Sequence, residues 1–160
     1  MDGALFVSEF GSAPDKDGTW LTNQLLEQEQ HRLGFAFWPW KESTGSTWGM
    51  FDPPPNECLR TSRERLLARV YPRATADRNL TFHYDASDGF FTLHASGSDS
   101  DPSTVVYIPP EVTGQVTLAG AVRGVVSTAG DGSRVVLASP TDGSFAVAVA
   151  PAPLRLTGCH

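Results

Sequence analysis

Cysteine is scarce in this sequence, as are long apolar runs and clusters of basic residues. Only two of the 160 residues are cysteines, and neither lies in a CxxC pair, so the cysteines do not form a zinc-binding motif. No apolar run approaches the roughly 20 residues that span a bilayer, so we expect no transmembrane segment. The 12 basic residues are outnumbered by 18 acidic ones and form no patch interleaved with aromatics, which argues against nucleic acid as a partner.

The two cysteines, Cys58 and Cys159, leave two alternatives open. They form one disulfide in an oxidising compartment, or they stay as two unpaired thiols, and the Cα separation that decides between these is not in the sequence. The N-terminal residues Met1-Asp2-Gly3 lack the positive and apolar segments of a signal peptide. Either the protein is not exported or its true N-terminus is missing.

What the sequence does contain is a globular composition in two contrasting halves. Hydrophobic residues make up 40% and charged residues 19%, unlike the composition of a disordered chain. All the tryptophans precede residue 76, and the remainder is rich in Val, Thr, Ala and Gly. We therefore expect two domains, residues 1–75 and residues 76–160, with α/β structure in the first and all-β structure in the second.

The first half predicts the order strand, helix, strand, helix. Residues 4–7 and 35–38 are short apolar runs typical of parallel strands buried on both faces. A helix is expected from about Thr19 to Leu33, with Gly34 ending it, and a second from Thr61 to about Val70.

Each expected helix has an apolar stripe. In the first, Trp20, Leu25 and Leu26 are expected to share one face. In the second, Thr61 and Glu64 match a capping box, in which Glu64 reaches back to the helix start. The arginines of this second segment are interpreted as a solvated helix face: Arg60, Arg63, Arg65 and Arg69.

The second half predicts an antiparallel β-sandwich. Short alternating segments recur between turn signals such as Gly130-Asp131-Gly132 and Asp142-Gly143. The expected strands are 80–84, 90–95, 104–108, 115–119, 124–128, 134–138 and 145–150. Its histidines His83 and His94 stand at no metal-ligand spacing, so we expect neither a metal nor a cofactor.

Chemistry is expected where the two strands of the first half end. Glu9 follows one strand and Trp40 follows the other. The carboxyl ends of adjacent parallel strands meet at one edge, which in a (β/α)₈ barrel is the face where active sites lie. A carboxylate beside an indole face suits a sugar, because the sugar's C–H face stacks on the ring while the carboxylate attacks the anomeric carbon.

Three segments carry a resemblance to a known family. Val7-Ser8-Glu9-Phe10-Gly11 resembles the strand-7 motif of glycoside hydrolase family 5, and Phe35 to Lys41 resembles its strand-8 segment. The stretch from Leu67 to Ala76 is similar to the junction that precedes a C-terminal β-sandwich in the endoglycoceramidase-like branch. The resemblance implies the last two β/α units of an incomplete (β/α)₈ barrel followed by that sandwich.

The resemblance also implies a function and site residues. It implies a retaining β-glycosidase that hydrolyses glycolipids or oligosaccharides outside the cell, with Glu9 as nucleophile. Trp40, Lys41 and Trp48 would line the substrate site, whereas Trp38 is interpreted as core and Glu42 as a solvated loop residue. The family's acid/base Glu follows an Asn at the end of a strand. The only Asn-Glu here, Asn56-Glu57, follows three prolines in a loop.

The acid/base Glu and the first six β/α units are therefore expected in a missing N-terminal portion. Without those units, we expect residues 1–75 not to fold stably alone, because their strands expose both edges and both faces. We also expect this chain by itself to be inactive. The alternatives are a non-catalytic β-sandwich module that braces a barrel or binds carbohydrate, and an assembly of chains that completes the site.

Overall fold

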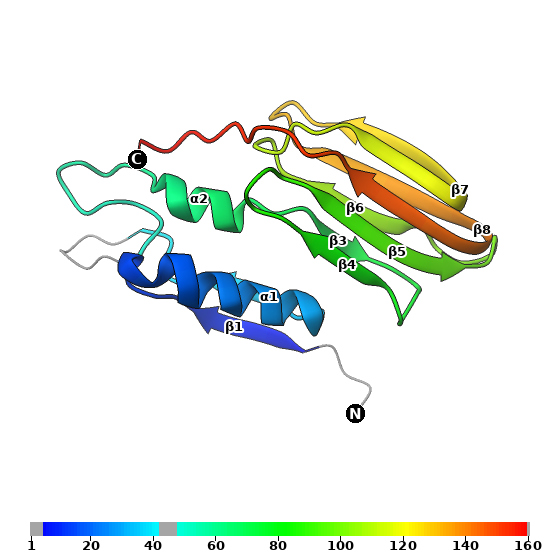
Figure 1. Ribbon diagram of the computed structural model, residues 1–160, viewed down its shortest axis with the longest axis horizontal. Coiled ribbons are helices and arrows are strands. Elements are labelled where there is room, and N and C mark those ends of the chain that lie inside the picture. Colours follow the sequence, from blue (N-terminus) through cyan, green and yellow to red (C-terminus); the bar gives the residue numbers. More distant parts are fainter. Residues whose placement is uncertain (1–4, 42–47, 160) are drawn as a thin grey trace. The chain divides into compact units, whose positions relative to one another are not determined.

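The structure is a computed structural model that describes residues 5–41 and 48–159 (Figure 1). It divides into two compact units: Met1–Leu67 with Leu156–His160, and Ala68–Arg155. The division therefore falls before the boundary expected at residue 76, and the C-terminal tail belongs to the first unit. In the described ranges no helix is both long and apolar enough to cross a membrane.

The first unit has the element order predicted from the sequence. Its strands are β1 (Phe6–Phe10) and β2 (Gly34–Phe37), and they pair in parallel. Between them lie the short turns η1 (Pro14–Lys16) and η2 (Asp17–Leu21) and the helix α1 (Thr22–Gln30). The second helix, α2 (Thr61–Leu67), follows a long loop. The predicted strand-helix-strand-helix order and the parallel pairing are confirmed.

The helical face of the first unit differs from the predicted one. Leu21 and Leu25 are 0% and 2% exposed and pack with Phe10, whereas Trp20 and Leu26 are 41% and 43% exposed. Leu21 and Leu25 are four residues apart and so lie on one side of the helix. Trp20 and Leu26 each stand one residue outside that pair, about 100° round the helix axis. The apolar face of this helix is therefore formed by Leu21 and Leu25 and, contrary to the prediction from the sequence, does not include Trp20 and Leu26.

The second unit is all-β, as expected, and consists of one antiparallel sheet. Its strands are β3 (Tyr71–Ala74), β4 (Thr81–Tyr84), β5 (Phe91–Gly97), β6 (Thr104–Ile108), β7 (Val116–Thr128) and β8 (Arg134–Val149). The sheet order is β3-β6-β8-β5-β4, and β7 pairs with β8. In Figure 1 the strands β7 and β8 are the two long arrows of this unit.

Four of the expected short strands are joined into the two long ones. Asp142-Gly143, predicted as a hairpin turn, lies inside β8, where Asp142 has a φ of 63°. On one side of this point β8 pairs with β6 up to Ala138, and on the other it pairs with β5 from Gly143. Strand β7 has an irregularity between Gly120 and Val122 opposite the same region. A bend with positive φ therefore looks like a turn in the sequence, although β8 is paired directly before and after it.

The long strands give the second unit a single apolar core. Val106 and Ile108 from β6 are fully buried in the same cluster as Phe91 and Leu93 from β5. Val147 and Val149 at the end of β8 join them. The sheet therefore curls around its own apolar face in a nearly closed, barrel-like shape.

Candidate active site

Glu9 lies in a β-bulge of β1. Val7 pairs with Phe35 and Phe10 with Phe37, so β1 advances three residues where β2 advances two. The extra residue lets Val7 and Phe10 both pack against the core of the unit, which regular alternation forbids for residues three apart. Glu9 itself is exposed. Bulges commonly re-aim a side chain beside a functional site, and here the bulge falls at the candidate nucleophile.

The carboxyl ends of the two strands are in direct contact. The backbone N–H of Trp38 donates to the carbonyl oxygen of Phe10 over 2.8 Å. At Gly11 a Cβ atom would lie 1.9 Å from the carbonyl oxygen of Trp38 and 3.8 Å from Cε3 of Trp48. The glycine that follows Glu9 and Phe10 is therefore required by the close approach of the second strand.

We expect Gly11→Ala to destabilise the first unit by about 1–3 kcal/mol, the usual cost of an overpacked site. The clash is with backbone, which cannot rotate away as a side chain does. The control is Gly18→Ala, where no atom lies within 4 Å of the added carbon. Urea unfolding followed by tryptophan fluorescence measures both, and equal midpoints for the two variants would contradict this account.

Three exposed indoles lie at or after the end of β2. Trp38, Trp40 and Trp48 are 49%, 67% and 44% exposed, so the expectation that Trp38 is core is wrong. Trp38 and Trp48 meet edge-on with ring centroids 6.5 Å apart, and Trp40 meets Phe51 in the same way at 5.4 Å. The backbone N–H of Met50 donates to the carbonyl oxygen of Trp40 over 2.9 Å, which fixes that residue to the loop.

Lys41 is held in place beside these rings. Its Nζ lies 2.7 Å from a carboxylate oxygen of Glu57 and 5.7 Å from the ring centre of Phe51. Glu57 is half-exposed in the loop that follows the prolines, and its partner is this lysine. Glu42, interpreted from the sequence as a loop residue, lies outside the described residues.

Arg63, expected on a solvated face, is the most deeply buried charge of the first unit. It is 0% exposed, and its guanidinium binds both carboxylate oxygens of Asp17, at 2.9 and 3.1 Å. It also donates to the carbonyl oxygens of Ser12, Trp48 and Gly49. One signal in the sequence identifies it: Arg63 stands three and four residues before Leu66 and Leu67, on the apolar side of α2.

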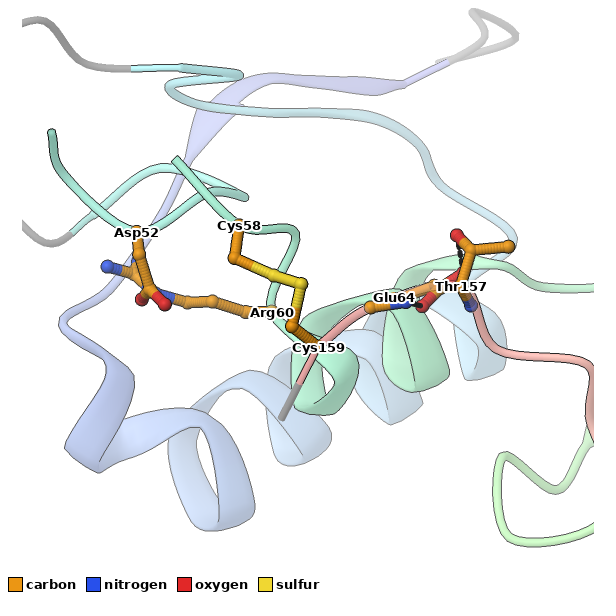
Figure 2. Close-up of a disulfide and its surroundings, with 7 residues drawn as sticks. Asp52, Cys58, Arg60, Glu64, Thr157 and Cys159 are labelled. Carbon is orange, nitrogen blue, oxygen red and sulfur yellow. Dashed lines mark hydrogen bonds and ion pairs between the residues drawn. A yellow bond between two sulfur atoms is a disulfide. The ribbon is translucent and has the colours of Figure 1, made fainter. Parts of the chain in front are cut away.

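The neighbouring Arg60, 7% exposed, is also not solvated. It donates to the Asp52 carboxylate over 2.9 Å and to the carbonyl oxygen of Gly49 over 2.6 Å. Figure 2 shows the Arg60 and Asp52 side chains beside a disulfide. Both buried arginines therefore bind the start of the loop between Trp48 and α2.

The C-terminal tail is fastened to the same loop and helix. Cys58 and Cys159 form a disulfide with a Cα separation of 6.0 Å, which decides between the two alternatives that the sequence left open (Figure 2). Glu64 is 4% exposed and accepts 2.7 Å hydrogen bonds from the backbone N–H and hydroxyl of Thr157 and the backbone N–H of Gly158. The carboxylate of Glu64 therefore binds the tail, where the sequence predicted a capping box.

No candidate metal centre occurs in the part of the chain that the structure describes: no group of three or more His, Cys, Asp or Glu side chains there is arranged to hold an ion. The chemistry available at this site is that of an exposed carboxylate, a lysine and several indole rings.

At the level of sequence, the chain matches no protein-family model and no curated protein. Solved structures do resemble it. Endo-glycoceramidase II from Rhodococcus sp., in a complex with a cellobiose-like isofagomine, matches 94% of the chain with a TM-score of 0.70 at 21% identity. An endogalactoceramidase matches 91% with a TM-score of 0.60 at 20% identity.

Sterylglucosidase 1 from Cryptococcus neoformans matches 96% of the chain with a TM-score of 0.64 at 15% identity. The chain spans 33%, 33% and 29% of the lengths of these three proteins. Likeness at such identities is likeness of fold. The chain thus has the fold of about one third of an endoglycoceramidase, an endogalactoceramidase and a sterylglucosidase, as the resemblance in its motifs implied.

Proposed function

We propose that this chain contributes the nucleophile, Glu9, to the active site of a retaining β-glycosidase. The observation that supports this most is the bulged parallel pairing of β1 and β2. It leaves Glu9 exposed next to Phe10, whose carbonyl oxygen accepts a hydrogen bond from Trp38, the first of the three exposed tryptophans. A carboxylate on one strand end and indole rings after the next supply a nucleophile and a stacking surface for a sugar.

In the proposed reaction the sugar stacks on the indole of Trp40, and the Glu9 carboxylate attacks the anomeric carbon. The bond from that carbon to the leaving oxygen breaks while a glycosyl ester forms on Glu9. A second carboxyl group, contributed by a part of the enzyme outside this sequence, protonates the leaving oxygen. It then takes a proton from water, and that water releases the sugar with its original configuration.

The proposed substrates are glycolipids or oligosaccharides. The names of the similar proteins, a glycoceramidase, a galactoceramidase and a sterylglucosidase, support sugars joined to lipid alcohols as the substrate class. Trp48 and Lys41 would contact the sugar beside Trp40. A disulfide fits the oxidising compartment that a secreted enzyme meets.

We also propose that β1, α1, β2 and α2 of the first unit are the last two β/α units of a (β/α)₈ barrel and that the all-β second unit is a β-sandwich. Phe6 on β1 and Leu5 just before it are 61% and 71% exposed, although parallel strands are normally covered on both faces. Neighbouring barrel strands would cover them. In the second unit β8 pairs with β6 before Asp142 and with β5 after it, and a sheet that bends there to enclose one apolar core supports the two facing layers of a sandwich.

Covalent trapping tests the proposed nucleophile. An activated 2-deoxy-2-fluoro glycoside transfers its sugar to a carboxylate nucleophile but is released slowly, so the glycosyl ester accumulates. With the intact enzyme that contains this sequence, we expect mass spectrometry to find one sugar on the peptide that contains Glu9. A sugar on another carboxylate, or none, would rule the assignment out.

For the purified 160-residue protein we expect no hydrolysis of aryl glycosides above the background rate, because the protonating carboxyl group is not in this sequence. Turnover that is lost on Glu9→Gln would show instead that the chain completes a site by itself.

A further inference from the structure

Two loops adjoin the candidate site, and one arginine binds both of them. The first loop begins at Gly11, directly after β1, and continues through Asp17. The second begins at Trp48 and leads to α2. Arg63, on α2, donates to Ser12 and Asp17 in the first loop and to Trp48 and Gly49 in the second.

We propose that Arg63 and Asp17 form a positioning pair that fixes the Glu9 strand end and the Trp48 loop relative to each other. The proposal rests on the proposed function, because it assigns the pair to the glycosidase site. Neither residue touches the sugar in this proposal. Both act through the loops that they hold.

Both charged groups of the Arg63–Asp17 pair are buried. Arg63 is 0% exposed and Asp17 is 3% exposed, so each charge depends on its protein partners. The hydroxyl of Ser12 lies within 3.4 Å of the Asp17 carboxylate, and the guanidinium lies 5.4 Å from the ring centre of Phe37 on β2. Removing one partner of a buried ion pair leaves an uncompensated charge, which is strongly destabilising for the local structure.

The geometry requires arginine in particular. Five N–H groups in a planar fork bind the two oxygens of Asp17 and three backbone carbonyls at once. A lysine has the same charge but only three donors on one nitrogen, so it cannot span both loops. Arg63→Lys therefore removes the connection while keeping the charge.

Loss of the Arg63 hydrogen bonds is expected to affect the candidate nucleophile, because few residues separate them. Ser12 is three residues after Glu9, and Gly11 lies between them against the carbonyl oxygen of Trp38. On the other side, Arg63 binds the backbone of Trp48, whose ring packs on Trp38. If the guanidinium is lost, the segment after Glu9 and the Trp48 ring are free to move independently.

Hydrogen exchange in the oxidised 160-residue protein tests the link between the loops. In Arg63→Lys we expect amides of residues 11–21 and 48–52 to exchange at least about tenfold faster, with β5 and β8 unchanged. The matched control is Arg65→Lys, the same substitution two residues along α2. If Arg63→Lys unfolds the whole first unit, Asp17→Glu, which keeps both buried charges and displaces the carboxylate, replaces it, and faster exchange in residues 11–21 is expected there. Unchanged exchange in both loops would refute the positioning pair.

Kinetics of the intact enzyme test its effect on the reaction. Titration with the 2-fluoro glycoside counts the active sites, so kcat is obtained per functional site. Misfolded protein in a variant therefore does not lower the measured kcat. We expect Arg63→Lys to lower this kcat by about 100-fold, with a smaller change in KM, because misplacement by about 1 Å has effects of that size. Arg65→Lys should match the wild type.

The two possible failures give different results. If the wild-type enzyme shows no adduct on Glu9, the proposed function is wrong and the positioning pair is wrong with it. If the adduct forms and Arg63→Lys keeps the wild-type kcat per site, the proposed function stands and only the positioning pair is refuted.

Discussion

Replacing Glu9 by glutamine in the intact enzyme is expected to lower kcat on the order of 10⁴-fold or more, since an amide cannot form the glycosyl ester. The fold should survive, because the Glu9 side chain is exposed and the bulge is set by the packing of Val7 and Phe10. The control is Glu27→Gln on α1, whose carboxylate is exposed and lies 3.7 Å from His31. Steady-state kinetics on an aryl glycoside measure both variants.

Chemical rescue distinguishes a nucleophile from an acid/base residue at position 9. In Glu9→Ala, added azide is expected to attack the anomeric carbon from the vacated side and to give a glycosyl azide of inverted configuration. In a variant of an acid/base residue the ester still forms, so azide gives the retained product. If NMR shows that Glu9→Ala gives a glycosyl azide of retained configuration, Glu9 is the acid/base residue and not the nucleophile.

The second large effect is expected on removal of the disulfide that Figure 2 shows. The double variant Cys58→Ser, Cys159→Ser should lose about 3 kcal/mol of stability in the first unit if the second unit stays folded. In that case the disulfide of the wild type closes a loop with only about 15 flexible residues when the first unit unfolds. If both units unfold together, the cysteines close a loop of 101 residues and the loss approaches about 5 kcal/mol.

The chain offers a separate probe for each unit. All four tryptophans lie in the first unit, and all three tyrosines, Tyr71, Tyr84 and Tyr107, lie in the second. Urea unfolding should therefore show a shifted tryptophan transition and an unshifted tyrosine transition in the double variant. Dithiothreitol should reproduce the shift in the wild type and have no effect on the variant. A tryptophan midpoint that is insensitive to both changes would mean that the disulfide does not stabilise the first unit.

The disulfide also bears on the expectation that residues 1–75 do not fold alone. That segment lacks the tail, and the tail supplies the partner of Cys58 and the three hydrogen bonds of Glu64. A small apolar core around Phe10, Leu21 and Leu25 is marginal without such links. The 160-residue chain contains them, and residues 1–75 do not.

Local patterns in the sequence determined a large part of this protein. Apolar runs flanked by a glycine and a proline predicted β1 and β2, and their α/β order predicted the parallel pairing. Alternation and turn residues predicted the all-β second half, with Thr104–Ile108 found as expected. The roles of Glu9, Trp40, Lys41 and Trp48 stay predictions, although the structure brings their strand ends and loops together in one unit.

Only the tertiary structure decided the rest, because the deciding contacts join residues far apart in the chain. The bulge at Glu9 depends on the register between β1 and β2, which periodicity within one strand does not fix. The partner of Arg63 is 46 residues away, the tail bound by Glu64 is 93 residues away, and Cys159 is 101 residues from Cys58. A charged residue on a helix is normally exposed, so the sequence predicts that it is solvated. It can be buried only where a partner binds it, and a partner so far away in the chain cannot be predicted from a local pattern.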